Sequence, residues 1–403
     1  MTVAAAPAAP DQTVARRVLI SLCVTEITSW GVLYYAFPVL TGDITAATGW
    51  PVTAVTAAFS LGQITAAVVG IAVGRVLDRR GPCAVMTTGS VLATTALVLI
   101  ATAPTLAAFT VGWMLAGAAM GGVLYPPAFA ALTRWYGPGR VRALTTLTLV
   151  AGLASTVFAP TTALLAAHLD WRQTYLVLAG ILAVITIPGH AWGLRGPWPA
   201  HPHQSRKVGG AGAIRRSRAF LALALAATMT GFAAYAVVIT LVPLLTERGL
   251  STTTAAVVLG LGGAGQVLGR LGYPALARRT SVRTRTVLIV AATAATIALL
   301  GLLTTLAALV VAAVLAGTTR GLFTLLQATA ITDRWGTVHY GQLTAVLSAP
   351  VTLAAALAPW AGAALATRLG GYAPTVLALA ALTALAAVVA AASIPRTETT
   401  HHD

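Results

Sequence analysis

The chain has 403 residues, of which 58% are hydrophobic and only 8% are charged. Since a typical soluble domain has roughly 25% charged residues, this composition excludes a soluble globular protein. The formal net charge of +16 would suit a nucleic-acid partner, but the basic residues gather in short loops between long apolar segments, which excludes that class as well.

Apolar segments follow one another along the whole chain, each close to the length of about 20 residues that crosses a hydrocarbon core. The sequence therefore predicts an all-α membrane protein with twelve transmembrane helices, in two pseudo-symmetric bundles of six helices. The predicted segments are residues 18–40, 52–74, 84–103, 106–132, 143–167, 173–193, 219–245, 252–277, 286–304, 307–331, 341–367 and 371–394.

The second half of the chain repeats the first at an offset of 199 or 200 residues. A duplicated helical membrane unit is typical of secondary transporters, which bind their substrate between the two copies. The aligned pairs are Tyr35 with Tyr235, Gly70 with Gly269, Arg79-Arg80 with Arg278-Arg279, Arg134-Trp135 with Arg334-Trp335, and Leu144-Thr145 with Leu343-Thr344.

Basic residues lie almost entirely on one side of the predicted membrane. Of the 25 lysine and arginine residues, only Arg172, Arg248 and Arg368 lie in loops on the other side, and Arg270 and Arg320 lie within apolar segments. Because loops rich in Lys and Arg stay in the cytoplasm, we expect both termini in the cytoplasm and the protein in the cytoplasmic (inner) membrane.

This orientation divides the chain into five parts. Residues 1–17 form a disordered cytoplasmic N-terminus, 18–193 the first bundle, 194–218 a cytoplasmic linker, 219–394 the second bundle and 395–403 a cytoplasmic tail. The basic linker is expected to rest on anionic lipid. Its His201-Pro202-His203 run is too sparse for a metal site, and we expect neither a metal nor a cofactor.

Thiol labelling tests the predicted orientation. Asp170→Cys should react with a membrane-impermeant thiol reagent added from outside, whereas Gly209→Cys should react only after the membrane is opened. The reverse labelling pattern would contradict the orientation.

Glu26 is the one acidic residue, of nine, that lies well inside a predicted segment. A carboxylate in hydrocarbon pairs, becomes neutral or faces a wet cavity. Alternatively, Glu26 lies near the cytoplasmic headgroups, since Arg17 is only nine residues away. Regular helical spacing places one apolar and aromatic face around it: Leu22, Trp30, Leu33 and Phe37, with Tyr34 at the margin.

The loop between the second and third segments reads Gly74-Arg75-Val76-Leu77-Asp78-Arg79-Arg80-Gly81. It resembles the loop signature of the major facilitator superfamily, in which a glycine lets the turn close and an Asp-Arg pair follows. This resemblance covers essentially the whole chain.

The resemblance implies two six-helix bundles that rock around a central cavity. It also implies that Asp78 contacts the end of the eleventh segment and favours the outward-facing state, a contact between a charge and a helix terminus. Gly74, Arg79 and Gly81 would complete this conformational motif. The second copy has Ala277 at the position of Asp78, so the latch would exist on one side only.

Arg320 lies deep in the tenth segment. It precedes Arg334 by 14 residues, which is about 21 Å along a helix. Thr324 and Gln327 follow on the same face, and the resemblance places this segment at the central cavity with the first, fourth and seventh. A structural arginine that holds two helices together is the alternative.

Arg270 in the eighth segment shares its face with Gln266 and can partly snorkel toward Arg278. Two buried arginines against one carboxylate are costly unless something negative neutralises them. A guanidinium matches a carboxylate with two parallel hydrogen bonds. The sequence therefore favours a small organic anion as substrate.

The spacing Gln266-x-x-x-Arg270 is similar to the acid-x-x-x-Arg pair of monocarboxylate transporters, whose arginine holds the substrate carboxylate and whose acid carries the coupled proton. Gln266 replaces that acid here, so Glu26 is the expected proton carrier. Together with the run from Trp30 to Tyr35, this spacing favours the monocarboxylate and oxalate/formate type branch. The expected substrate-binding residues are Trp30, Tyr34, Tyr35, Gln266, Arg270, Arg320, Thr324 and Gln327.

Two other functions stay open. Proton-driven efflux of drugs or a natural product would suit the same residues, but drug antiporters of the superfamily usually have an arginine where Trp113 precedes Gly117-x-x-x-Gly121, and Gly-Pro where this chain has Ala159-Pro160. A receptor or scaffold without transport would not need ionisable groups in its spans. The sequence contains no nucleophile-base constellation and no phosphate loop that would indicate an enzyme. We expect a monomer in the lipid bilayer, with protons and a small anion as its partners.

Overall fold

The computed structural model describes residues 12–196, 198, 211–336 and 340–394, without the side chains of Asp78, Pro138, Ala211 and residues 340–342. Its regular structure is helical over these residues, and twelve of its helical segments are long and apolar enough to cross a membrane. This confirms the predicted fold class.

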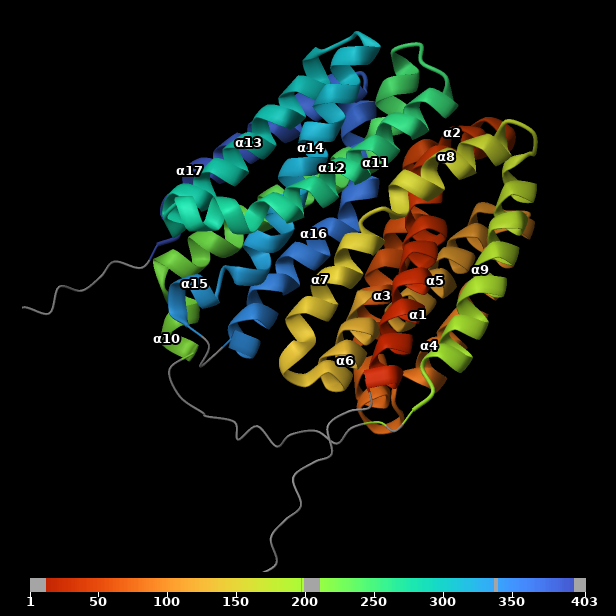
Figure 1. Cartoon of the computed structure of the whole chain (residues 1–403). Helices are drawn as coiled ribbons and strands as arrows, with labels where there is room; N and C mark the ends of the chain where they lie inside the picture. Colours follow the sequence, from red (N-terminus) through yellow and green to blue (C-terminus); the bar gives the residue numbers. More distant parts are fainter. Residues whose placement is uncertain (1–11, 197, 199–210, 337–339, 395–403) are drawn as a thin grey trace, which may run out of the picture.

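The helices of the first half form the N bundle, and those of the second half form the C bundle (Figure 1). The N bundle comprises α1 (Gln12–Trp30), the π-helical turn η1 (Gly31–Tyr35), α2 (Ala36–Thr48), α3 (Val52–Arg80), α4 (Pro82–Thr102), α5 (Leu106–Val123), α6 (Tyr125–Tyr136), the 3-10 turn η2 (Gly137–Gly139), α7 (Arg140–Ala151), α8 (Ala154–Ala166) and α9 (Trp171–Gly193). The C bundle comprises α10 (Ala211–Arg216), α11 (Arg218–Glu247), α12 (Thr252–Arg279), α13 (Val282–Leu302), α14 (Leu306–Thr329), α15 (Thr332–Trp335), α16 (Tyr340–Leu369) and α17 (Tyr372–Ala390).

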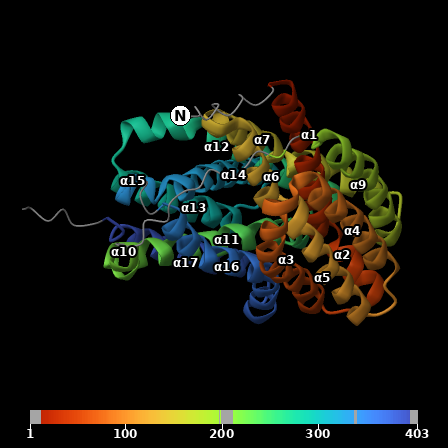
Figure 2. The ribbon, with the colours of Figure 1, turned by 90° about the horizontal axis from the view of Figure 1, so that it is seen from below.

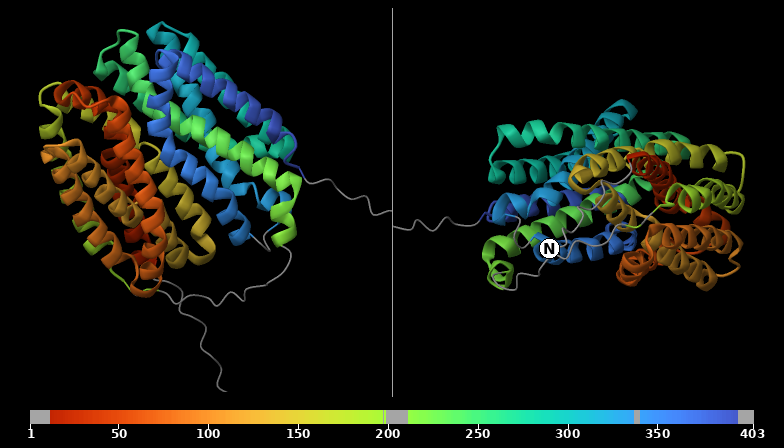
Figure 3. Two further views of the ribbon diagram at one scale, coloured as in Figure 1. Left: turned by 180° about the vertical axis from the view of Figure 1, so that it is seen from behind. Right: turned by 60° about the horizontal axis from the view of Figure 1, so that its bottom comes forward.

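The two bundles stand side by side, as the views from below and from behind also show (Figures 2 and 3). We call the end of the molecule where α1 and α11 begin the linker end, and the opposite end, where α2 ends and α3 begins, the far end. The predicted linker and both predicted tails fall largely outside the described residues. Residues 12–17 are already helical in α1, whereas the sequence placed them in a disordered terminus, and α10 lies within the predicted linker.

Close helix contacts show that the bundles are copies in the same register. A Cβ atom on Gly117 of α5 would lie 1.9 Å from the carbonyl oxygen of Gly62 in α3. Gly317 of α14 meets Gly262 of α12 in the same way, at 1.8 Å. Both residues of this second pair lie 200 positions after their counterparts. Small residues permit such close approach in membranes, so the sequence repeat is also a repeat of helix packing.

Three membrane segments of the N bundle are interrupted near mid-depth. The first changes to a π-helical turn at Gly31–Tyr35. The fourth breaks at Leu124, whose backbone is extended just before Pro126 and Pro127, because proline cannot donate the backbone hydrogen bond that would continue the helix. The fifth breaks between α7 and α8. All three interruptions lie at the cavity described below.

Hydrogen bonds join the two bundles in their far-end halves. The hydroxyl of Thr156 in α8 donates to the carbonyl of Gly260 in α12 at 2.8 Å. The backbone N–H of Trp360 in α16 donates to Ser60 Oγ in α3 at 3.1 Å. The structure is therefore closed at the far end.

Candidate functional site

A cavity lies between the bundles at mid-depth. Its two connected parts have about 890 Å³ and 950 Å³ of unoccupied space, and they share Trp30, Tyr34, Tyr235 and Gln327. The second part runs along the linker-end half of α16. Since the bundles are joined at the far end, the cavity extends from mid-depth toward the linker end.

The structure brings all eight expected substrate-binding residues together around the first part of this cavity. Three come from the N bundle and five from the C bundle, so the cavity is shared between the halves. Their part in binding stays a prediction. These residues are Trp30, Tyr34, Tyr35, Gln266, Arg270, Arg320, Thr324 and Gln327.

Arg320 and Gln266 form a polar pair on the C-bundle wall. The Nη2 atom of Arg320 donates to Gln266 Oε1 at 3.1 Å. The Nε atom of Arg320 is buried and has no hydrogen-bond partner among the described residues. The guanidinium is therefore held in place by a neutral amide, which leaves its charge uncompensated.

Arg270 reaches across the cavity to the N bundle. It donates to the backbone carbonyl of Thr148 in α7, and only 6% of its surface is exposed. Its Nε atom also lacks a partner within the described part of the chain. A carbonyl oxygen provides a dipole and no full charge, so this contact leaves Arg270 positive and links the two bundles at mid-depth.

Among the described residues, no carboxylate lies within salt-bridge distance of Arg270 or Arg320. The ion pair found there joins Arg285 and Asp333 instead. Two uncompensated guanidinium groups in a low-dielectric interior strongly favour a negative ligand. That an anion binds there stays a prediction.

Aromatic side chains form the N-bundle wall. The ring of Trp30 lies 5.6 Å from Tyr34 and 5.1 Å from Tyr125, measured between centroids. Tyr125 also stacks on Phe129 at 5.0 Å. Across the cavity, Tyr34 approaches Tyr235 of the C bundle at 6.5 Å. Such rings offer apolar faces to the body of an organic ligand and polar edges to its charged group.

Glu26 does not line the cavity. It is completely buried one helical turn before Trp30, whose indole lies within interaction range, and neither carboxylate oxygen makes a hydrogen bond of normal geometry in the described chain. Tyr125 lies within electrostatic reach of both Glu26 and Arg270. Because the side chain is completely buried, it is not exposed to the linker-end headgroups. The regular helical face predicted around Glu26 ends at Gly31, because the π-helical turn changes the spacing of the residues that follow.

Residues 74–80 of the motif form the last turns of α3, where the sequence predicted a loop. The chain turns only at Gly81, whose φ of 77° favours glycine. A Cβ atom there would lie 3.3 Å from the ring of Trp198. Arg79 is exposed and Gly74 lies within α3. The side chain of Asp78 lies outside the described residues, so the latch that it would form stays a prediction.

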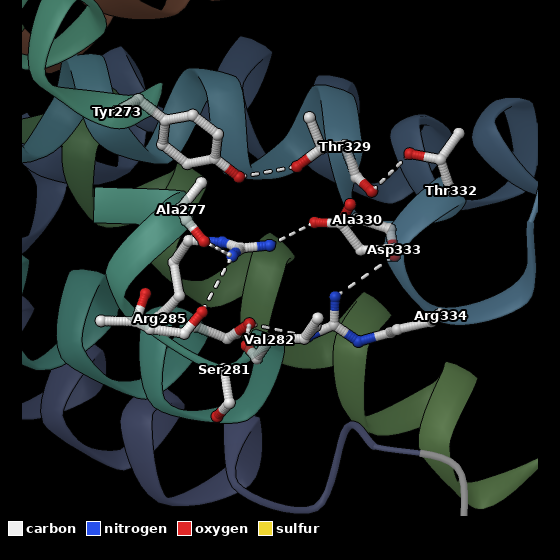
Figure 4. Close-up of polar contacts among 12 residues, drawn as sticks. Tyr273, Ala277, Ser281, Val282, Arg285, Thr329, Ala330, Thr332, Asp333 and Arg334 are labelled. Carbon is white, nitrogen blue, oxygen red and sulfur yellow. Dashed lines mark hydrogen bonds and ion pairs between the residues drawn. The ribbon is translucent and has the colours of Figure 1, made fainter. Parts of the chain in front are cut away.

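The sequence predicted a structural partner for neither Arg285 nor Arg334, but both belong to a polar cluster at the linker end of the C bundle (Figure 4). Arg285 is 6% exposed and pairs with Asp333 at 2.5 Å. Its Nη1 atom also donates to the carbonyl of Ala277 at 3.3 Å. Ala277 stands in the C bundle at the repeat position of Asp78. The buried Arg285 therefore contacts the position that Asp78 occupies in the N bundle.

Arg334 completes this cluster. It donates from Nη2 to Thr286 Oγ1 at 2.7 Å and from Nε to the carbonyl of Ser393 at 2.9 Å. Burial lowers the pKa of Arg334 to about 10, so it remains protonated at neutral pH. The cluster therefore ties the ends of α13, α14 and α17 together.

Removing the buried arginine should destabilise the C bundle. Arg285→Ala leaves Asp333 without its ion-pair partner and is expected to lower the free energy of unfolding by about 2 kcal/mol. Arg283→Ala is the matched control because Arg283 is exposed two residues away. The midpoint of thermal unfolding in detergent measures both variants, and equal midpoints would show that the ion pair contributes nothing.

Sequence reasoning also missed cavity residues. Tyr125, Phe129 and Thr148 line the cavity, but the faces of α6 and α7 depend on breaks in the fourth and fifth segments. The repeat of Tyr35 and Tyr235 was the available signal for Tyr235. For metals, the described residues contain no cluster of three or more His, Cys, Asp or Glu side chains that would hold an ion.

A sequence model of the Major Facilitator Superfamily matches residues 22–306, and no curated protein sequence matches the chain. One similar solved structure is a bacterial homolog of the human lysosomal transporter Spinster, in an inward-facing and unoccupied conformation. Its TM-score is 0.76 at 14% sequence identity, and the match covers 95% of this chain and 98% of that chain. The nucleoside transporter NupG has a TM-score of 0.74 at 12% identity, with 94% and 98% covered. At these identities the similarity shows the fold alone.

Proposed function

The chain belongs to the major facilitator superfamily, and we propose that it moves a small organic anion of the carboxylate type across the cytoplasmic membrane. Its family and fold are those of multi-pass membrane proteins that transport small molecules by alternating access, and they indicate a transporter rather than an enzyme. In such folds the substrate binds near mid-depth between the two repeats.

One observation carries the proposal: Arg270 and Arg320 line one cavity and have no carboxylate partner in the described chain. A guanidinium keeps its charge at any physiological pH and binds a carboxylate through two parallel hydrogen bonds. The substrate anion would supply the missing negative charge. Neutral partners, the amide of Gln266 and the carbonyl of Thr148, hold both side chains ready for it.

The aromatic N-bundle wall supports an organic anion over an inorganic one. Trp30, Tyr34 and Tyr125 would cover the apolar body of the ligand while the C-bundle arginines hold its charged group. A ligand that contacts both bundles has a different affinity for each conformation. Such a difference in affinity is required for a ligand to shift the equilibrium between conformations.

We further propose that transport is coupled to protons through Glu26, as a symport of the monocarboxylate and oxalate/formate type. Glu26 is completely buried one helical turn before Trp30, and Tyr125 is close enough to interact electrostatically with both Glu26 and Arg270. The orientation with both termini in the cytoplasm is part of the same proposal and would make the described state open to the cytoplasm. A monomer is sufficient, because one chain supplies both walls of the cavity.

Efflux of an anionic natural product is the second candidate, since it uses the same cavity in the opposite direction. Trp113, which stands where drug antiporters usually have an arginine, is completely buried in the N bundle. This observation disfavours a drug-antiporter mechanism. A receptor or scaffold would not need two guanidinium groups at the cavity that have no carboxylate partner among the described residues.

A thermal-shift screen of the purified protein tests the proposal, because a ligand that binds only the folded protein stabilises it. Small carboxylates and aromatic acids should raise the unfolding midpoint, and the shift should vanish in the Arg270→Ala, Arg320→Ala double variant. Lipophilic cations and the neutral nucleoside uridine are the comparison ligands. Stabilisation by either of these, with none by the acids, would contradict the proposed substrate class.

A further inference from the structure

A small apolar pocket opens beside Arg320, inside the C bundle. The space within it and across its open mouth is about 440 Å³, and it shares Arg320, Ala234 and Val238 with the central cavity. Apart from Arg320 and Thr293, the described residues that line it are apolar or glycine. The guanidinium of Arg320 therefore lies at the junction between a polar cavity and an apolar pocket.

The N bundle has an aromatic cluster at the corresponding place. Phe37 and Phe59 stack with 4.1 Å between their centroids, and Trp113 lies edge-on to both, at 5.2 Å and 4.8 Å. All three side chains are completely buried. Together they fill the interior between α2, α3 and α5.

The repeat shows why the C bundle has a pocket there. The counterparts of Phe37, Phe59 and Trp113, 200 positions later, are Val237, Leu259 and Ala313, and all three line the pocket. The glycine contacts between α3 and α5, and between α12 and α14, support this register for Phe59 and Trp113, and the pair Tyr35 and Tyr235 supports it for Phe37. Smaller side chains at all three positions leave the space that the aromatic rings fill in the other copy.

We propose that this pocket is a subsite for an apolar substituent of the transported anion, a short branched alkyl or phenyl group attached to the carboxylate that Arg320 holds. The inference rests on the proposed function, because Arg320 must first bind the charged group. A substituent that points into the C bundle from a carboxylate on this guanidinium would lie at the mouth of the pocket, while the rest of the ligand faces the aromatic wall. Burying that substituent removes apolar surface from water and strengthens binding.

Filling the pocket with its own repeat counterpart tests the subsite. Leu259→Phe restores the residue type of Phe59, and Val237→Phe is a second variant in case the first does not fold. Val257→Phe is the matched control, since Val257 lies on the same helix and is 41% exposed on its surface. Half-saturating concentrations are measured by thermal shift for acetate, isovalerate, phenylacetate and the neutral isovaleramide, with gel filtration reporting folding.

The wild type and Val257→Phe should prefer isovalerate and phenylacetate to acetate. In Leu259→Phe this preference should fall about tenfold or more, with binding of acetate unchanged. An unchanged preference in both filled variants would overturn the subsite. If isovaleramide binds as tightly as isovalerate and Leu259→Phe abolishes its binding, the subsite is supported and the proposed anionic substrate is contradicted. If neither the acids nor the amide bind, both the subsite and the proposed substrate class are contradicted.

Discussion

Arg320→Ala is expected to reduce carboxylate transport by about 100-fold or more while the protein still inserts and folds. Removing one partner of a desolvated charge pair costs a large part of the binding energy, and the neutral Gln266 beside it provides no substitute. Arg270→Ala should have a similar effect. Arg320→Lys should restore little, because an ammonium loses the planar fork that binds both carboxylate oxygens. Uptake into proteoliposomes measures all three variants.

Arg368→Ala is the control for these arginine variants. Arg368 is exposed at the far-end terminus of α16, so its loss removes one positive charge without touching the cavity. Wild-type transport by Arg320→Ala would return that residue to a structural role, in which it only holds α14 against α12.

Glu26→Gln is expected to separate substrate movement from proton coupling. A group couples protons to transport only if its proton affinity differs between the two conformations. The amide of glutamine does not titrate at physiological pH and therefore cannot carry the proton. The variant should bind the carboxylate and exchange it across the membrane. It should not concentrate the carboxylate under an imposed pH gradient.

Asp43→Asn provides the comparison for Glu26→Gln, since Asp43 is a partly exposed acid on α2, near the far end of the same membrane segment. It should accumulate substrate as the wild type does. We would abandon the proton role if Glu26→Gln accumulated the carboxylate as well as the wild type under the same gradient.

The membrane fold was predictable from the sequence because lipid imposes a simple rule: every crossing segment must be long, apolar and helical. The two arginines within such segments were equally visible, since charged residues there are rare. Their convergence on one cavity followed from the repeat and the family resemblance. Gln266, the neutral partner of Arg320, was visible in the sequence. The partner of Arg270 was not, because it is the backbone carbonyl of Thr148 in the other bundle.

The aromatic wall was only partly predictable. Regular helical spacing placed Trp30 and Phe37 on one face, but the π-helical turn at Gly31–Tyr35 separates them. Trp30 lines the cavity, whereas Phe37 belongs to the buried aromatic cluster. A single π-helical turn has no clear composition signal. The position of Tyr125 likewise depends on the break at Leu124.

Arginines in loops were the least predictable group. A count of positive charges gives orientation, and it does not distinguish the exposed Arg283 from the buried Arg285 two residues later. That distinction depends on Asp333, which the fold brings to Arg285 from 48 positions away along the chain.

A structure of the protein in complex with its best stabilising carboxylate tests the central claim most directly. The ligand carboxylate should lie between Arg270 and Arg320, within about 3 Å of guanidinium nitrogen atoms, and the aromatic side chains of Trp30 and Tyr34 should cover its organic part. A ligand bound elsewhere, or one whose charged group contacts neither arginine, would contradict the claim that this cavity selects an organic anion.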